Sequence, residues 1–245
     1  MVLTSVAVFL IAAAVTVKTI WFPSAKDAWF QLGQQKLRQV PAGKVVVRPT
    51  HFSSSSQSGT TFVNRRMVGR NVTFKELIAV AYGENSGRVA LPSGAPKNNF
   101  DFLVTALSNQ QGLLREAVQK KTGYTAQKEM RDTDVLALKI EDQTLPGLKI
   151  SDADEKQNTN FKNGRLYFTH TKLAEISGGL EGVLKMPVVD KTGLTGFYDF
   201  SLAWRAGMNP NNLSRDDLDK ILAEWGLGFE PDTASIEMLV VEKAK

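Results

Sequence analysis

An internal sequence repeat, called the echo below, is the feature that most constrains the fold of this chain. Phe100-Asp101-Phe102, within Asn99–Val104, aligns with Tyr198-Asp199-Phe200, about a hundred residues later and inside Pro187–Trp204. The alignment of these segments also places Phe74–Leu77 near Leu173–Ile176 and Gly123 near Gly226, at offsets of 98 to 103 residues. Shared order at a nearly constant offset is typical of a duplicated unit. We therefore expect one fold to occur twice in tandem.

The first copy is expected over residues 43–150. Short β-branched and aromatic runs predict strands at 44–48, 62–71, 100–106, 124–130 and 135–140, the last two forming a hairpin around residues 131–133. Its two helices are each expected to begin at a capping box, Thr73 with Glu76 and Ser108 with Gln111, and to end at Gly83 and Gly123. The pattern of this copy is β-α-β-α-β-β.

The second copy is expected over residues 151–245 in the same order, after a polar linker at 151–165. Strands are predicted at 166–169, 198–204 and 236–242, and helices at 173–184 and after the capping pair Ser214 and Asp217, with Gly226 as the last stop. The fold class that follows is α+β, with two tandem β-α-β-α-β-β repeats. Each repeat is expected to be a small sheet covered on one face by two helices.

The N-terminal residues 1–22 are predicted to form a transmembrane or signal helix. Val2–Val17 is interrupted only by Thr4, Ser5 and Thr16, and Trp21 follows at the distance of an interfacial anchor. A positively charged leader is missing, and the later lysines favour a cytoplasmic C-terminal side, so cleaved signal peptide and retained anchor both stay open. Residues 23–42 are expected to form a juxtamembrane amphipathic helix.

Composition excludes several function classes. The chain has no cysteine, which removes thiol catalysis, cysteine-ligated zinc and disulfides. The net charge of +5 is divided as +3 over residues 1–42, +6 over 43–150 and −4 over 151–245. The longest basic runs are pairs, Arg65-Arg66 and Lys120-Lys121, whereas a nucleic-acid reader concentrates basic and aromatic side chains on one element. No nucleic-acid partner is therefore expected.

Catalytic and metal-binding signals are absent from the sequence pattern. His51 and His170 are the only histidines, and no paired spacing joins them, so we predict no metal site and no cofactor. His51 is expected to be exposed and His170 to make local hydrogen bonds. Asp101 and Asp199 occupy matching places, and the sequence favours outward positions on strands over an acid–base pair.

Two polar segments are interpreted as connections rather than as sites. Asp190–Gly193 lacks the full phosphate-loop pattern and is predicted to be a turn. Ser53–Ser56 lacks the glycines of a nucleophile elbow and is predicted to be a flexible loop. No catalytic residue is assigned, and the binding residues stay unknown.

The assembled segments resemble the soil-associated protein family, a bacterial domain of unknown function. The likeness covers about residues 43–243 and rests on Gly69–Ile78, Ala81–Gly83, Asn99–Phe102, Leu173-Ala174, Pro187–Gly196, Tyr198–Phe200 and Gly226–Gly228. It implies an exported or membrane-anchored protein without assigned activity, whose domain also accompanies membrane-embedded zinc peptidases of the antibiotic-sensor type. The repeat is also loosely similar to the short N-terminal modules of secretins and TonB-dependent receptors, which bind proteins.

These observations predict a non-enzymatic interaction module with the globular part in the periplasm or outside the cell. The membrane is contacted through residues 2–22, and another protein is the expected partner. Two alternatives stay open: a small-ligand binder or hydrolase with a site between the repeats, and a regulatory domain of a membrane peptidase or sensor system.

Overall fold

The computed structural model describes residues 27–53, 55–163, 165–203 and 213–244. The predicted transmembrane or signal helix at residues 1–22 lies outside these ranges. Within them, none of the helices combines the length and the apolar character needed to cross a bilayer.

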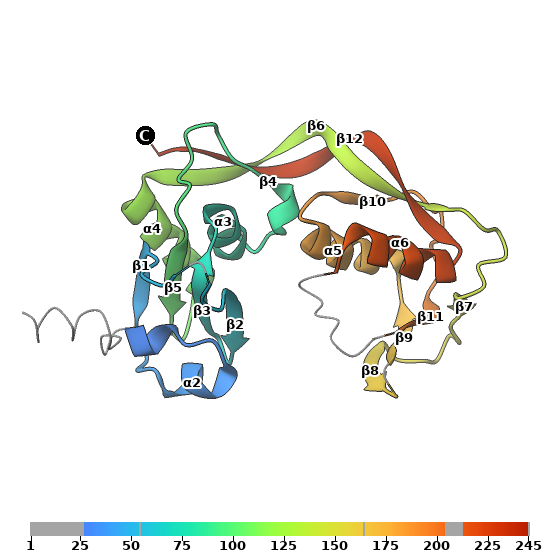
Figure 1. Ribbon diagram of the computed structural model, residues 1–245, viewed down its shortest axis with the longest axis horizontal. Helices are drawn as coiled ribbons and strands as arrows, with labels where there is room; N and C mark the ends of the chain where they lie inside the picture. The colour runs from blue at the N-terminus through green and yellow to red at the C-terminus, as the bar shows by residue number, and fades with distance from the viewer. Residues whose placement is uncertain (1–26, 54, 164, 204–212, 245) are drawn as a thin grey trace, which may run out of the picture. The chain divides into compact units, whose positions relative to one another are not determined.

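The fold is α+β, with three four-stranded sheets and five α-helices in the described part of the chain (Figure 1). The chain divides into two compact units. In its described part, the first unit comprises 27–83, 92–125 and 242–244, and the second comprises Glu84–Leu91 and Ala126–Val241.

The sheet of the first unit is antiparallel throughout. Its strands are β1 (Val45–Pro49), β2 (Gly59–Val63), β3 (Arg66–Val72) and β5 (Phe100–Val104), in the order β1-β5-β3-β2. The single strand predicted at 62–71 is a hairpin instead, because Asn64 and Arg65 take left-handed φ angles of 47° and 61° and turn the chain.

Helices α3 (Phe74–Tyr82) and α4 (Gln110–Thr122) pack on one face of this sheet. The predicted capping box of Thr73 and Glu76 is present, and Gly83 and Gly123 end the two helices in the left-handed conformation. The second predicted capping box is wrong. Helix α4 starts instead after Asn109, whose side chain makes no capping hydrogen bond.

An aromatic cluster forms the centre of this core. The ring of Phe74 lies 5.7 Å from that of Phe100 and 5.5 Å from that of Tyr124, measured between centroids. Gly69 lets Phe102 lie flat across the sheet, since a Cβ at Gly69 would come within 2.0 Å of the Phe102 ring. These contacts explain why the repeated aromatic residues Phe100 and Phe102 are buried in the core.

The opposite face of the first sheet is also covered, by the segment that precedes it. The 3₁₀ turn η1 (Asp27–Phe30) buries Phe30 against the sheet, and helix α2 (Gln34–Gln39) buries Leu37, with Val40 just after the helix also buried there. Gly33, at φ 133°, separates the two elements, so the continuous amphipathic helix expected at 23–42 is broken there. The first sheet therefore has helical cover on both faces, where cover on one face was predicted.

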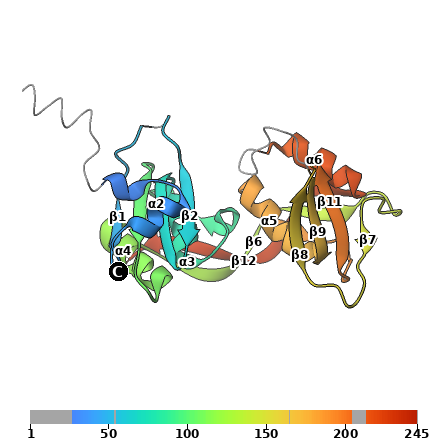
Figure 2. The ribbon, with the colours of Figure 1, turned by 90° about the horizontal axis from the view of Figure 1, so that it is seen from below.

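The sheet of the second unit has the order β7-β11-β9-β8 and is also antiparallel (Figure 2). Its strands are β7 (Lys149–Ile150), β8 (Asn158–Lys162), β9 (Arg165–Thr171) and β11 (Tyr198–Ala203). Strand β8 lies within residues 151–165, for which the sequence predicts a polar linker.

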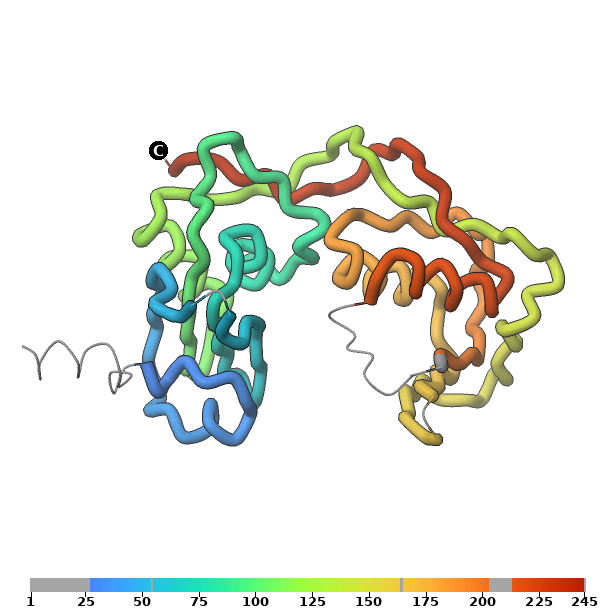
Figure 3. The backbone as a smooth tube through the Cα atoms, viewed as in Figure 1, coloured from blue at the N-terminus to red at the C-terminus, as the bar shows by residue number. Residues whose placement is uncertain are grey.

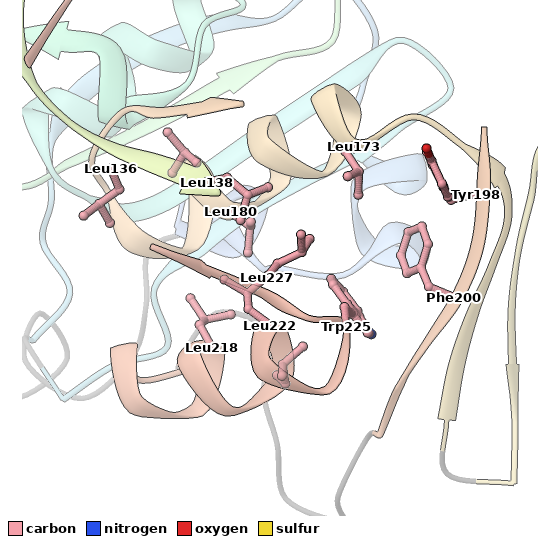
Figure 4. Close-up of a cluster of buried hydrophobic side chains, with 12 residues drawn as sticks. Leu136, Leu138, Leu173, Leu180, Tyr198, Phe200, Leu218, Leu222, Trp225 and Leu227 are labelled. Atoms are coloured by element: carbon pink, nitrogen blue, oxygen red, sulfur yellow. The ribbon is translucent and has the colours of Figure 1, made fainter. Parts of the chain in front are cut away.

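Helices α5 (Leu173–Leu184) and α6 (Arg215–Glu224) supply the core of the second unit. Their buried leucines pack with Phe200 of β11 and with Leu136 and Leu138 of strand β6 (Tyr124–Ile140) in one cluster (Figure 4). The predicted capping box of Ser214 and Asp217 is confirmed.

The third sheet has the order β10-β6-β12-β4 and belongs to the second unit except for the first two residues of β6 and the last two of β12. Strand β6 (Tyr124–Ile140) and strand β12 (Leu227–Lys243) are each 17 residues long and run beside one another (Figure 3). The hairpin predicted within 124–140 is therefore wrong, because one strand passes through Arg131–Thr133 without a turn. Short strands β4 (Val89–Ala90) and β10 (Val188–Asp190) pair in parallel with β12 and β6.

Residues 84–91 connect the elements of the first sheet in sequence but pack in the second unit. The short helix η2 (Ser86–Arg88) contacts α5, and Arg88 forms an ion pair with Glu181 at 2.7 Å. Glu181 is 3% exposed and also accepts a hydrogen bond from the backbone N–H of Val188 at 3.0 Å. The hydrogen bonds with Glu181 raise the pKa of Arg88.

Helix α5 contains a glycine that the fold does not need. Gly178 is exposed, and a Cβ there would meet nothing within 4 Å. We expect Gly178→Ala to stabilise the protein by about 0.5–1 kcal/mol, because alanine loses less backbone entropy on forming a helix. Thermal unfolding measures this. Gly87→Ala is the matched contrast and should destabilise, since its Cβ would lie 2.9 Å from the backbone carbonyl of Met186.

Candidate interaction surface

The sheets differ in how their edges are protected. Strands β4, β10 and β7 are edges of only two or three residues, too short to template another chain. Strand β1 is packed by α4, and β2 is packed by α2, whose preceding residue Gly33 donates its N–H to the Thr61 hydroxyl at 3.3 Å. These five of the six edges are therefore short or packed by a helix.

Strand β8 is the exception. It is an edge of five residues, and every one of them is exposed. In the described ranges its main contacts are with β9 alone. It carries no proline and a single charge, Lys162, so the usual protections of an edge strand are largely missing. Along such an edge, backbone N–H and C=O groups point outward and can pair with another strand.

Large apolar side chains accompany this edge. Phe161 is 58% exposed and lies opposite Leu166 of β9, while Tyr167 is 39% exposed and lies opposite Asn160. Because neighbouring residues of a strand point to opposite faces, the two aromatic rings flank the edge on its two sides. Phe161 extends the face that carries Phe168 and Phe200, whose rings stack at 4.8 Å.

The matching aspartates have structural partners. Asp101 is fully buried, so its predicted outward position is wrong. Its carboxylate accepts the N–H of Asn71 at 3.0 Å and pairs with Arg48 Nε at 3.1 Å. Arg48 also pairs with Asp27 of η1 at 2.5 Å. The prediction failed because η1 covers the face to which Asp101 points.

Asp199 repeats part of this geometry in the second unit. Its carboxylate accepts the N–H of His170 at 3.0 Å and the Ser151 hydroxyl. Asn71 and His170, the two amide donors, both have left-handed φ angles, 53° and 52°. Partial burial disfavours the charged form of Asp199, but the hydrogen bonds from Ser151 and His170 and the charge of Lys149 outweigh it and lower its pKa. Both aspartates thus fix a backbone bend before a helix.

His51 belongs to the first unit and His170 to the second. His51 is exposed, as predicted. The His170 ring stacks on Phe197 with centroids 3.9 Å apart, and its backbone N–H makes the local hydrogen bond to Asp199. The His170 Nδ1 atom is buried and has no hydrogen-bond partner among these residues. The described residues hold no group of three or more potential metal-ligating side chains.

The two polar segments are connections. Asp190 accepts hydrogen bonds from the backbone N–H and the hydroxyl of Thr192 at 2.9 and 2.7 Å, and Gly193 follows at φ 73°, which confirms the predicted turn. In the serine loop the Ser53 hydroxyl bonds those of Ser55 and Ser56, each at 3.0 Å.

Sequence reasoning missed β8, although one signal for it was present. Phe62 and Phe161 stand 99 residues apart, within the offsets of the echo, and both are exposed on edge strands at 53% and 58%. Extending the alignment into the linker would have placed a strand there.

The described residues thus form an α+β fold with helices packed on its sheets and with the edge strand β8 exposed. A family model described as "Protein of unknown function (DUF3738)" matches residues 75–244, and the chain belongs to this family. The comparisons with curated proteins and with solved structures find no match.

Proposed function

We propose that this chain is a non-enzymatic protein-interaction module that binds its partner at the exposed edge of the second sheet. The observation that carries the proposal is β8, a five-residue edge strand without cover in the described residues, when the other edges are short or packed. An extended segment of a partner would add a strand beside β8 through main-chain hydrogen bonds. Phe161 and Tyr167 would supply apolar contact on the two faces.

We further propose that the chain contains two tandem copies of one module and is tethered at the membrane, outside the cytoplasm. Three findings support duplication: the two antiparallel sheets have corresponding strand orders, a carboxylate bonds a left-handed residue in each, and β6 and β12 have equal length. The apolar run Val2–Val17 supports the tether. The association with soil bacteria rests on the sequence resemblance alone.

Site-specific photo-cross-linking tests the binding surface in the full chain in its native membranes. A benzophenone amino acid in place of Phe161 should give cross-linked adducts with another polypeptide chain. The same probe in place of Met130, which is 66% exposed on β6, is the matched control and should give few. The proposal is overturned if position 161 gives no more adduct than position 130.

A tether test needs a truncation that leaves the first unit intact. Removal of residues 1–42 would also delete Phe30 and Leu37, which pack on the first sheet. Removal of residues 1–24 leaves this cover in place, and the truncated protein should leave the membrane fraction while keeping its thermal transition. Retention in membranes after this truncation would argue against the tether.

A further inference from the structure

We infer that the partner at β8 is a second copy of this chain, paired antiparallel about a two-fold axis at Asn160. This inference rests on the proposed function and names its partner. The full five-residue strand then pairs with itself: Asn160 faces Asn160, Thr159 faces Phe161, and Asn158 faces Lys162. A two-fold interface requires this kind of self-complementary patch.

The side chains of β8 suit such pairing. No like charges face each other, since the single charge Lys162 lies opposite Asn158, and opposed like charges would destabilise a pair. The Asn160 amide carries both donor and acceptor atoms and can bond its own copy. Thr159 and Phe161 are residue types that strands favour.

Phe161 gains the most from this arrangement. Directly opposite residues of antiparallel strands share a face, so each Phe161 would lie over Thr159 of the other copy. The two Phe161 rings would then be diagonal neighbours, a spacing that aromatic side chains bridge. The ring that is 58% exposed in the single chain would be covered on the side away from Leu166.

One pair of five-residue strands buries less surface than a stable dimer requires, so the association is expected to be weak in dilute solution. The proposed tether would compensate, because copies held in one membrane are restricted to its plane, which raises their effective concentration. This favours a second copy over a partner that arrives from solution.

Because the chain has no cysteine, introduced cysteines report the register directly. In the two-fold pair, Asn160→Cys brings two cysteines to Cα separations of about 4.5–5.5 Å, which a disulfide spans. The full chain in membranes, treated with a mild oxidant, should form a disulfide-linked dimer. Lys162→Cys is the matched control on the same strand, and Met130→Cys is the exposed control elsewhere.

The register predicts that Lys162→Cys forms little dimer, since the two copies of position 162 stand four residues apart along the paired strands, roughly 13 Å at the rise of a strand. Adding Phe161→Glu to the Asn160→Cys chain should lower the dimer yield roughly fivefold through repulsion between diagonal carboxylates. A thermal melt of Phe161→Glu checks that the fold is unchanged.

The outcomes separate this inference from the proposed function. A dimer at position 160, absent at 162 and 130 and reduced by Phe161→Glu, supports the second copy. Equal dimer at all three positions indicates random collision and overturns the inference. No dimer at position 160, together with photo-adducts of position 161 to a different protein, overturns the inference and leaves the proposed function standing.

Discussion

Arg88→Ala is expected to destabilise the second unit by about 3–5 kcal/mol, the cost of removing one partner from a buried ion pair. The Glu181 side chain is only 4% exposed, and Arg88 holds it through bonds of 2.7 to 3.0 Å. Without Arg88 the carboxylate would stay buried, and the Val188 N–H would be its remaining donor among the described residues. Urea denaturation followed by circular dichroism measures the loss.

Part of this loss of stability would come from detachment of residues 84–91. Residues 84–91 are held in the second unit by the ion pair, by the pairing of Val89 with Leu239, and by the Asn85 side chain, which donates to the Gly178 carbonyl at 2.7 Å. Hydrogen exchange should therefore show the Val89 and Ala90 amides losing protection before the core of α5.

A double variant separates charge from packing. Arg88→Met with Glu181→Gln keeps an oxygen for the Val188 N–H and removes both charges, so most of the stability should return. If the double variant is as unstable as Arg88→Ala, the loss of stability comes from the lost packing of the guanidinium group and not from the lost ion pair.

Local signals predicted both ends of helix α3. The capping pair Thr73 and Glu76 and the stop at Gly83 depend on residues within one turn, so the sequence contains all of the relevant interactions. The hairpin expected at 131–133 failed for the opposite reason. Those polar residues resemble a turn, but β6 pairs with β12, about a hundred residues further along, and that pairing is invisible locally.

The candidate interaction surface also depends on pairing that the local sequence does not show. Strand β8 has no buried face, so it lacks the apolar alternation by which strands are recognised, and its composition resembles a linker. Only its position beside β9 makes it a strand. The burial of Asp101 was likewise unpredictable from β5, since the cover comes from η1, some seventy residues upstream.

Asp101→Ala is expected to destabilise the first unit by about 3–5 kcal/mol. The change would leave the N–H of Asn71 buried without its acceptor and would remove one of the two carboxylates paired with Arg48. Asn71 holds a left-handed φ of 53°, which costs a non-glycine residue energy that this hydrogen bond offsets. Urea denaturation gives the total, and exchange of the Asn71 amide reports the bend itself.

Asp199→Ala provides the matched control, because Asp199 makes the same bond to a left-handed residue in a more exposed setting. Water can replace part of what Asp199 supplies, so its loss should cost only about 1 kcal/mol. Asp101→Asn should fall between the two, since the amide oxygen can still accept from Asn71 while the charge facing Arg48 is gone. If Asp101→Ala and Asp199→Ala lower the free energy of unfolding equally, the contribution of these carboxylates to stability comes from the shared bend. Burial and the pairing with Arg48 would then not explain it.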